Sequence, residues 1–196
     1  AADIGAHAVI VQIPDPDRQR AIDRYARLCE LASSYGLYVV LEFVSWTQTA
    51  DLRSAASIVK SADKDNGGIL VDMLHFDRSG SSLEDLQKLP AQWFRFVHLC
   101  DAPRATPSLT EGTISTARSD RRFPGKGELN IGEVLCRLPN VPYSLEIPNK
   151  KLLDQLGPEE YARQVIDSAR QYLANEFVHM TKSSLPEKDL TRYQQR

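Results

Sequence analysis

Four apolar segments of the chain each end on a residue that can bind a divalent cation. The segments are Tyr38–Glu42, Ile69–Asp72, Phe94–His98 and Pro142–Glu146. Short apolar runs of this kind are typical of strands that are buried on both faces of a parallel sheet. Because active sites of parallel α/β folds lie at the C-terminal ends of the strands, we expect the four terminal side chains to converge on one cavity.

The donor set of these strand ends consists of three carboxylates and one imidazole: Glu42, Asp72, Glu146 and His98. This combination of oxygen and nitrogen, without sulfur, favours Mn²⁺, Mg²⁺, Co²⁺ or a catalytic Zn²⁺ over a structural zinc site. Each residue taken singly is better explained by an ion pair or a capped backbone group. Their shared position at four strand ends is what predicts a metal site.

Other side chains with binding chemistry follow the same strand ends. His75, just after Asp72, could hold a substrate oxygen, and Trp46, after Glu42, could form an apolar wall or simply pack. Arg104, in the loop after His98, could bind a hydroxyl, carboxylate or phosphate group. Asp101 could orient His98 or a cation, or pair with Arg104.

The connection from Asp101 to Glu128 is long for a loop in a compact domain and is therefore expected to be functional. We expect Arg118, Arg121 and Arg122 to belong to a mobile lid over the cavity, where they would contact anionic groups. Solvated surface charge is the alternative for at least one of them. A phosphate-binding P-loop is not predicted, because the GxxxxGK[ST] pattern is absent.

The elements that position these residues alternate between strand and helix. The first strand, Ala8–Val11, precedes a helix that we expect to begin at Asp15 as N-cap, with Pro16 at its first position, and to end at Gly36. Further helices are expected at Thr49–Lys60, at Ser82–Leu89, after Asn130 as N-cap, and at Pro158–Leu173.

Five βα units at a spacing of about 30 residues fit an open doubly wound sheet or the latter part of a (β/α)8 TIM barrel. The barrel is favoured because an open sheet reverses at a switch point, so four consecutive strand ends would not share one cavity. A complete barrel takes about 250 residues, so this chain of 196 residues is expected to lack about three N-terminal βα units. We expect a partial barrel at residues 1–175, a polar C-terminal tail at 176–196, and exposed sheet edges that would favour a homo-oligomer.

Composition excludes several classes of partner. The formal net charge of −2 gives no reason to expect nucleic acid or an anionic membrane surface as a partner. No apolar run approaches the roughly 20 residues of a membrane span, and no signal peptide is visible. Cys29, Cys100 and Cys136 lack CxxC spacing and are interpreted as reduced thiols of a cytoplasmic protein.

Taken together, these motifs resemble the xylose-isomerase-like TIM barrel superfamily, and within it the sugar phosphate isomerase/epimerase branch. They lie between residues 8 and 148 and comprise Leu41-Glu42-Phe43, Val71-Asp72-Met73-Leu74-His75, His98-Leu99-Cys100-Asp101 with Arg104, Pro124-Gly125-Lys126-Gly127-Glu128, and Leu145-Glu146. The resemblance implies one divalent cation, usually Mn²⁺, at Glu42, Asp72, His98 and Glu146. It also implies that His75 and Arg104 contact substrate, and that Glu42 and Glu146 act as acid and base.

The implied activity is isomerisation or epimerisation of a sugar, or of a sugar-like polyol or keto acid, by proton abstraction next to a carbonyl through an enediolate. A dehydratase of the inosose or 3-dehydroshikimate type is the alternative on the same scaffold. An abasic-site endonuclease is less favoured, because such relatives hold several zinc ions with many histidines and this chain has four. A non-catalytic binding domain is disfavoured because all four candidate ligands are retained. Asn130 stands where relatives often have Asp.

Overall fold

The sheet of this protein consists of five parallel strands arranged in chain order. The computed structural model describes residues 1–103 and 110–184, with side chains described as far as residue 176. The strands are β1 (Ala8–Val11), β2 (Tyr38–Glu42), β3 (Gly67–Asp72), β4 (Val97–Leu99) and β5 (Tyr143–Leu145). Since the order never reverses, the sheet has no switch point, and the TIM-barrel prediction is confirmed over the doubly wound alternative.

The strand register brings the four candidate ligands onto one face of the sheet. Glu42 pairs with Leu70, and Asp72, two residues further along β3, pairs with His98. His98 in turn pairs with Ser144, so Glu146 follows two residues beyond that level. Side chains alternate between the two faces of a sheet with a period of two residues. These even offsets therefore direct all four side chains the same way.

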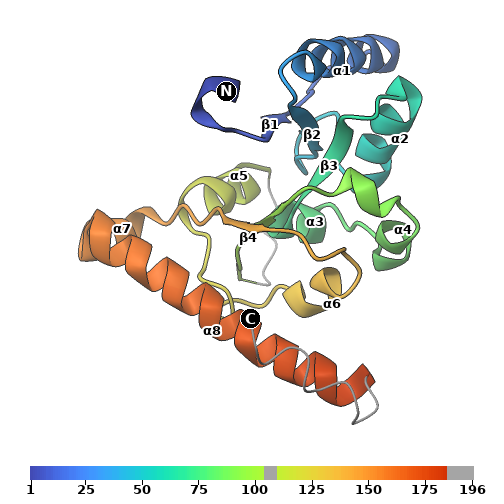
Figure 1. Ribbon diagram of the computed structural model, residues 1–196. Helices are drawn as coiled ribbons and strands as arrows, with labels where there is room; N and C mark the ends of the chain where they lie inside the picture. Colours follow the sequence, from blue (N-terminus) through green and yellow to red (C-terminus); the bar gives the residue numbers. More distant parts are fainter. Residues whose placement is uncertain (104–109, 185–196) are drawn as a thin grey trace.

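The helices are α1 (Arg18–Ser33), α2 (Leu52–Ala62), α3 (Met73–Arg78), α4 (Leu83–Gln87), α5 (Thr110–Ser119), α6 (Ile131–Leu135), α7 (Lys150–Leu156) and α8 (Pro158–Ser184), with 3-10 turns at Ala2–Ile4 and Ala91–Trp93. Helices α1, α2 and α4 (blue to green) pack next to one another on one side of the sheet, and the long α8 (orange and red) runs along the bottom of Figure 1. Tyr25 is buried and links α1 to the sheet by two hydrogen bonds. Its hydroxyl donates to the Val39 carbonyl at 2.9 Å and accepts from the Gly68 amide at 2.8 Å.

Two predicted helix ends are wrong. The N-cap of α1 is Asp17, whose side chain accepts from the Arg20 amide at 2.9 Å, and Asp15 instead forms ion pairs with Arg20 and Arg24. The carboxylate of Asp15 is occupied by these two guanidinium groups, whereas that of Asp17 is free to cap the helix. At the other end of the chain, α8 continues past Leu173 to Ser184, since no glycine or proline interrupts the sequence before Pro186.

Further differences concern the segments between the strands. The fourth strand begins at Val97 rather than Phe94, because the backbone bends at Arg95 after the 3-10 turn Ala91–Trp93. Helices α3, α5 and α7 were not predicted, and Asn130 precedes α6 without a side-chain capping bond. The predicted polar tail begins inside α8, and residues 185–196 lie outside the described part of the chain. Within that part, no helix is both long and apolar enough to cross a membrane.

Candidate metal centre

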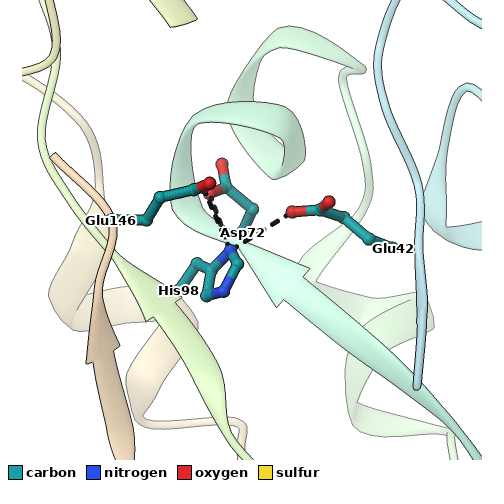
Figure 2. Close-up of side chains that lie close together, drawn as sticks. All are labelled: Glu42, Asp72, His98 and Glu146. Atoms are coloured by element: carbon teal, nitrogen blue, oxygen red, sulfur yellow. Dashed lines mark ion pairs between the residues drawn. The ribbon is translucent and has the colours of Figure 1, made fainter. Parts of the chain in front are cut away.

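Glu42, Asp72, His98 and Glu146 meet at the C-terminal edge of the sheet, as their strand-end positions predicted. Each offers one ligand atom, and these four atoms all lie within 4.8 Å of one another. His98 Nδ1 is central, at 3.2 Å from Glu42 Oε1, 3.7 Å from Asp72 Oδ2 and 3.1 Å from Glu146 Oε2. Figure 2 shows Glu42 and Glu146 approaching His98 from opposite sides, with Asp72 between them.

Two buried atoms of this cluster indicate what it could hold. Among the described residues, neither His98 Nδ1 nor Glu146 Oε2 makes a hydrogen bond of acceptable geometry, despite the short distance between them. Buried polar atoms normally have partners. Three carboxylates and one imidazole match the ligand preference of a divalent cation, and all but Glu146 are buried. The residues present therefore fit such a cation.

The charges of the cluster shift the pKa values of its members. Burial lowers the pKa of His98, but ion pairing with Glu146 and Glu42 outweighs burial and raises it to about 9. Burial raises the pKa of Glu42, but His98 and Gln12 outweigh burial and hold it below its ordinary value. The cluster thus stabilises the ionised form of Glu42 next to a positively charged imidazole.

Arg121 is part of this cluster and not of a lid. Its side chain is buried, and Nη1 lies 2.5 Å from Asp72 Oδ2 and 3.1 Å from Glu146 Oε2. The prediction that Arg121 contacts anions from a mobile lid is therefore wrong. Its partners are the carboxylates of the site itself.

The other two arginines of the long connection lie at the surface. Arg118 is exposed near the end of α5, and Arg122 is exposed with its guanidinium 3.6 Å from Asp120. The structure does not bring either side chain into the metal-ligand cluster. Their contact with substrate stays a prediction, and so does that of Arg104, which lies outside the described residues.

His75 and Trp46 pack against each other beside the cluster. Their ring centroids are 5.0 Å apart in an edge-to-face arrangement, and His75 Nδ1 lies 3.5 Å from Ser45 Oγ. The His75 amide donates to Asp72 Oδ1 at 3.0 Å, so Asp72 is also the N-cap of α3. Burial lowers the pKa of His75, which favours the neutral imidazole. Substrate contact by either ring stays a prediction.

Asp101 holds the long connection together instead of orienting His98. Its Oδ1 accepts from the Ala102 and Leu129 amides, and its Oδ2 accepts from the Gly125 and Gly127 amides, all between 2.8 and 3.0 Å. A side chain at Gly127 would overlap the Asp101 carboxylate, which explains the glycine there. Among the described residues these contacts do not include His98, and the predicted pairing with Arg104 falls on a residue outside the described part of the chain.

Gln12 was missed by the sequence analysis. It directly follows β1, and its Nε2 donates to Glu42 Oε2 at 2.6 Å. The signal was available, because Gln12 occupies a strand-end position like those of the four ligands. It was overlooked because an amide is a weaker candidate for a metal ligand than a carboxylate or an imidazole.

Comparisons with known proteins support the fold and the class of site. The model of a protein family described as xylose isomerase-like TIM barrel matches residues 1–172. An inosose isomerase of Halalkalibacterium halodurans is 27% identical over 165 residues, which cover 82% of this chain and 56% of that protein. A 3-dehydroshikimate dehydratase of Pseudomonas aeruginosa is 28% identical over 132 residues, which cover 65% of this chain and 20% of that protein. This chain thus spans just over half the length of the inosose isomerases it matches.

Solved structures show the same fold at low sequence identity. The crystal structure of IOLI protein with a bound zinc atom superposes with a TM-score of 0.74 at 20% identity, covering 94% of this chain and 66% of that one. An L-ribulose 3-epimerase superposes with a TM-score of 0.66 at 15% identity, covering 100% of this chain and 68% of that one. At these identities the likeness establishes the fold alone.

Proposed function

Because the chain belongs to the xylose isomerase-like TIM barrel family, we propose that it is a divalent-metal-dependent isomerase or epimerase of a small sugar-like polyol or keto compound. The reaction begins with removal of a proton from the carbon next to a carbonyl group. The observation that carries the proposal is the convergence of four ligand atoms within 4.8 Å, two of which are buried without hydrogen bonds among the described residues. The names of the inosose isomerases among its relatives support the substrate class.

Glu42, Asp72, His98 and Glu146 would hold the cation. Their donor set favours Mn²⁺, with Mg²⁺, Co²⁺ and Zn²⁺ as alternatives, and a related structure contains zinc. When bound, such a cation would polarise a carbonyl oxygen and stabilise the negative charge that develops there.

Glu146 and Glu42 divide the proton transfer. The Glu146 side chain is 42% exposed and can reach a substrate, whereas that of Glu42 is 6% exposed and is held by Gln12. The two carboxylates lie on opposite sides of His98 (Figure 2), so they can address opposite faces of one carbon. Return of the proton to the same carbon gives epimerisation, and delivery to the neighbouring carbon gives isomerisation.

Dehydration is the second candidate, favoured by the 3-dehydroshikimate dehydratases of Pseudomonas aeruginosa and Bacillus anthracis among the relatives. It requires the same proton removal, after which a hydroxyl group leaves from the neighbouring carbon. Mass spectrometry of the product separates the candidates, because an isomer or epimer keeps the substrate mass and a dehydration product is lighter by one water.

The replacement Glu146→Gln in the full protein tests the proposal. Gln keeps a carbonyl oxygen that can still ligate, but it cannot accept a proton at neutral pH. We expect the variant to retain metal while turnover of a ketose or inosose falls about 10²-fold or more. Deuterium from D₂O should enter the carbon next to the carbonyl with the unmodified protein and not with the variant.

The matched control is Glu159→Gln at the exposed start of α8, which should keep full turnover. Near-normal turnover by a metal-loaded Glu146→Gln protein would refute the two-glutamate mechanism. Absence of bound metal in the unmodified protein would refute the proposal as a whole.

A further inference from the structure

Arg121 is the one arginine that the structure places against the candidate metal ligands among the described residues. Its side chain is only 4% exposed, and the energetic cost of burying its positive charge is offset by the negative charge of Asp72, which is fully buried. The proposed function gives Arg121 no part, since it neither offers a ligand atom nor faces open solvent. Its contacts nevertheless go to the atoms on which that function depends.

The oxygen atoms that Arg121 contacts are those that face His98. Nη1 lies 2.5 Å from Asp72 Oδ2 and 3.1 Å from Glu146 Oε2. The same two oxygens lie 3.7 and 3.1 Å from His98 Nδ1. A carboxylate oxygen has two lone pairs, so Asp72 Oδ2 can accept from Arg121 and still bind a cation. The guanidinium therefore holds the Asp72 carboxylate by a hydrogen bond and attracts the Glu146 carboxylate by its charge.

Arg121 is itself held by backbone contacts on both sides. Nε donates to the Ala117 carbonyl at 2.9 Å, at the last turn of α5. Its amide donates to the Pro148 carbonyl at 3.1 Å, and its carbonyl accepts from Asn149 Nδ2 at 2.9 Å. Because Pro148 follows Glu146 by two residues, the backbones that carry Arg121 and Glu146 are tied together next to the cluster.

Glu146 needs such support more than the other ligands do. It lies beyond the end of β5, and its side chain is 42% exposed, whereas Glu42, Asp72 and His98 are buried. A long exposed side chain populates several rotamers unless a partner selects one. Nη1 supplies two contacts to Glu146, one to Oε2 at 3.1 Å and one to the main-chain oxygen at 3.2 Å.

We propose that Arg121 is a positioning residue, which keeps the carboxylates of Asp72 and Glu146 in the geometry that binds the cation. This inference rests on the proposed metal site and adds the group that preorganises it. Partners that orient metal ligands in this way are a general feature of metal sites.

The Co²⁺-loaded full protein provides the test, because the visible absorption of Co²⁺ depends on the number and geometry of its ligands. We expect the Arg121→Gln spectrum to shift from that of the unmodified protein toward that of Glu146→Ala, in which this ligand is removed outright. The matched control is Arg163→Gln, since Arg163 also pairs with two carboxylates, Glu160 and Asp167, but on the outer helix α8. Its spectrum should not shift.

Circular dichroism establishes whether each variant folds. If Arg121→Gln does not fold, Arg121→Lys replaces it, because Lys keeps the buried charge but lacks the fork that reaches Ala117 and both carboxylates at once. A shifted spectrum is expected for that variant too. A folded Arg121 variant with an unshifted spectrum would overturn the positioning role and leave the metal site intact. An unmodified protein that shows no bound Co²⁺ would overturn both.

Discussion

Gln12 and Glu42 are joined by a hydrogen bond that leaves each oxygen of the Glu42 carboxylate with a different task. Gln12 Nε2 donates to Oε2 at 2.6 Å, while Oε1 faces His98 Nδ1 at 3.2 Å. The two residues stand at the ends of the adjacent strands β1 and β2. Glu42 is thus oriented by a neutral amide and Glu146 by a cationic guanidinium, which gives the two proposed proton carriers different environments.

Replacement of Gln12 by Leu should remove the hydrogen bond that orients the Glu42 carboxylate. A hydrogen bond to a charged group contributes about 1.5–3 kcal/mol, so turnover should fall about tenfold to a hundredfold if Glu42 acts in proton transfer. Because Gln12 helps to hold the pKa of Glu42 low, the acid limb of the pH–rate profile should also move to higher pH. Steady-state kinetics between about pH 4 and pH 8 would measure both effects, because ordinary carboxyl groups have pKa values of roughly 4.

The control for this experiment is Gln19→Leu, since Gln19 is exposed on α1 and pairs with Asp23. It should leave both rate and profile unchanged. Identical profiles for Gln12→Leu and the unmodified protein would show that the Gln12 contact does not tune Glu42.

Metal affinity should increase with pH over an unusual range. Without metal, ion pairs with Glu146 and Glu42 raise the pKa of His98 to about 9, so the imidazole is protonated at pH 7. Binding requires the neutral form and must release that proton. The apparent association constant should therefore rise about tenfold per pH unit until about pH 9, whereas an unperturbed histidine would level off near pH 6.5.

Isothermal titration with Mg²⁺ or Mn²⁺ in buffers of different ionisation enthalpy checks this directly. About one proton should be released per ion bound at pH 7. An association constant that stays flat between pH 7 and pH 9 would contradict the raised pKa of His98.

The ligand set could be predicted because it follows from two local rules. Strands of a parallel sheet end at the same edge, and even offsets in register select one face, so Glu42, Asp72, His98 and Glu146 were visible in the sequence. Consecutive Arg121 and Arg122 could not be told apart in that way. Which of them is buried depends on contacts of the connecting segment with α5 and with the residues after β5, and these contacts are distant in sequence.

For Asp101 and Asp17, too, the sequence identified the candidate residue but could not decide its role. An acidic residue after a strand predicts either a site or a loop contact, and only the positions of the amides of Gly125, Gly127 and Leu129 decide that Asp101 organises the loop. Asp15 and Asp17 both flank Pro16 and both fit an N-cap, and only the backbone conformation identifies Asp17. Local chemistry supplied the candidates, and tertiary contacts selected among them.

Replacement of Gly68 by Ala should destabilise the sheet that carries Asp72. An added methyl group would overlap the main-chain oxygen of Trp93, which cannot move without shifting the turn before β4. Overpacking of this kind costs about 1–3 kcal/mol, and thermal denaturation would measure it. Gly132→Ala is the control, because its methyl group meets only the carboxylate end of Glu176, a flexible side chain. Equal melting temperatures for the two variants would contradict this view of Gly68.

Replacement of Asp101 should separate the stability of the long connection from the metal site. In Asp101→Ala four amides lose their acceptor, and each buried donor without a partner costs about 1–3 kcal/mol, although those that reach water cost less. We expect a loss of about 3 kcal/mol or more in the free energy of unfolding. Asp101→Asn keeps one of the two carboxylate oxygens and should lose less stability.

Because none of the candidate metal ligands contacts Asp101 among the described residues, the folded variants should still bind one cation. The control is Asp120→Asn at an exposed position, which should leave stability nearly unchanged. If Asp101→Ala unfolded at the same urea concentration as the unmodified protein, the four hydrogen bonds would not hold the connection together. If it folded but bound no metal, Asp101 would belong to the metal site.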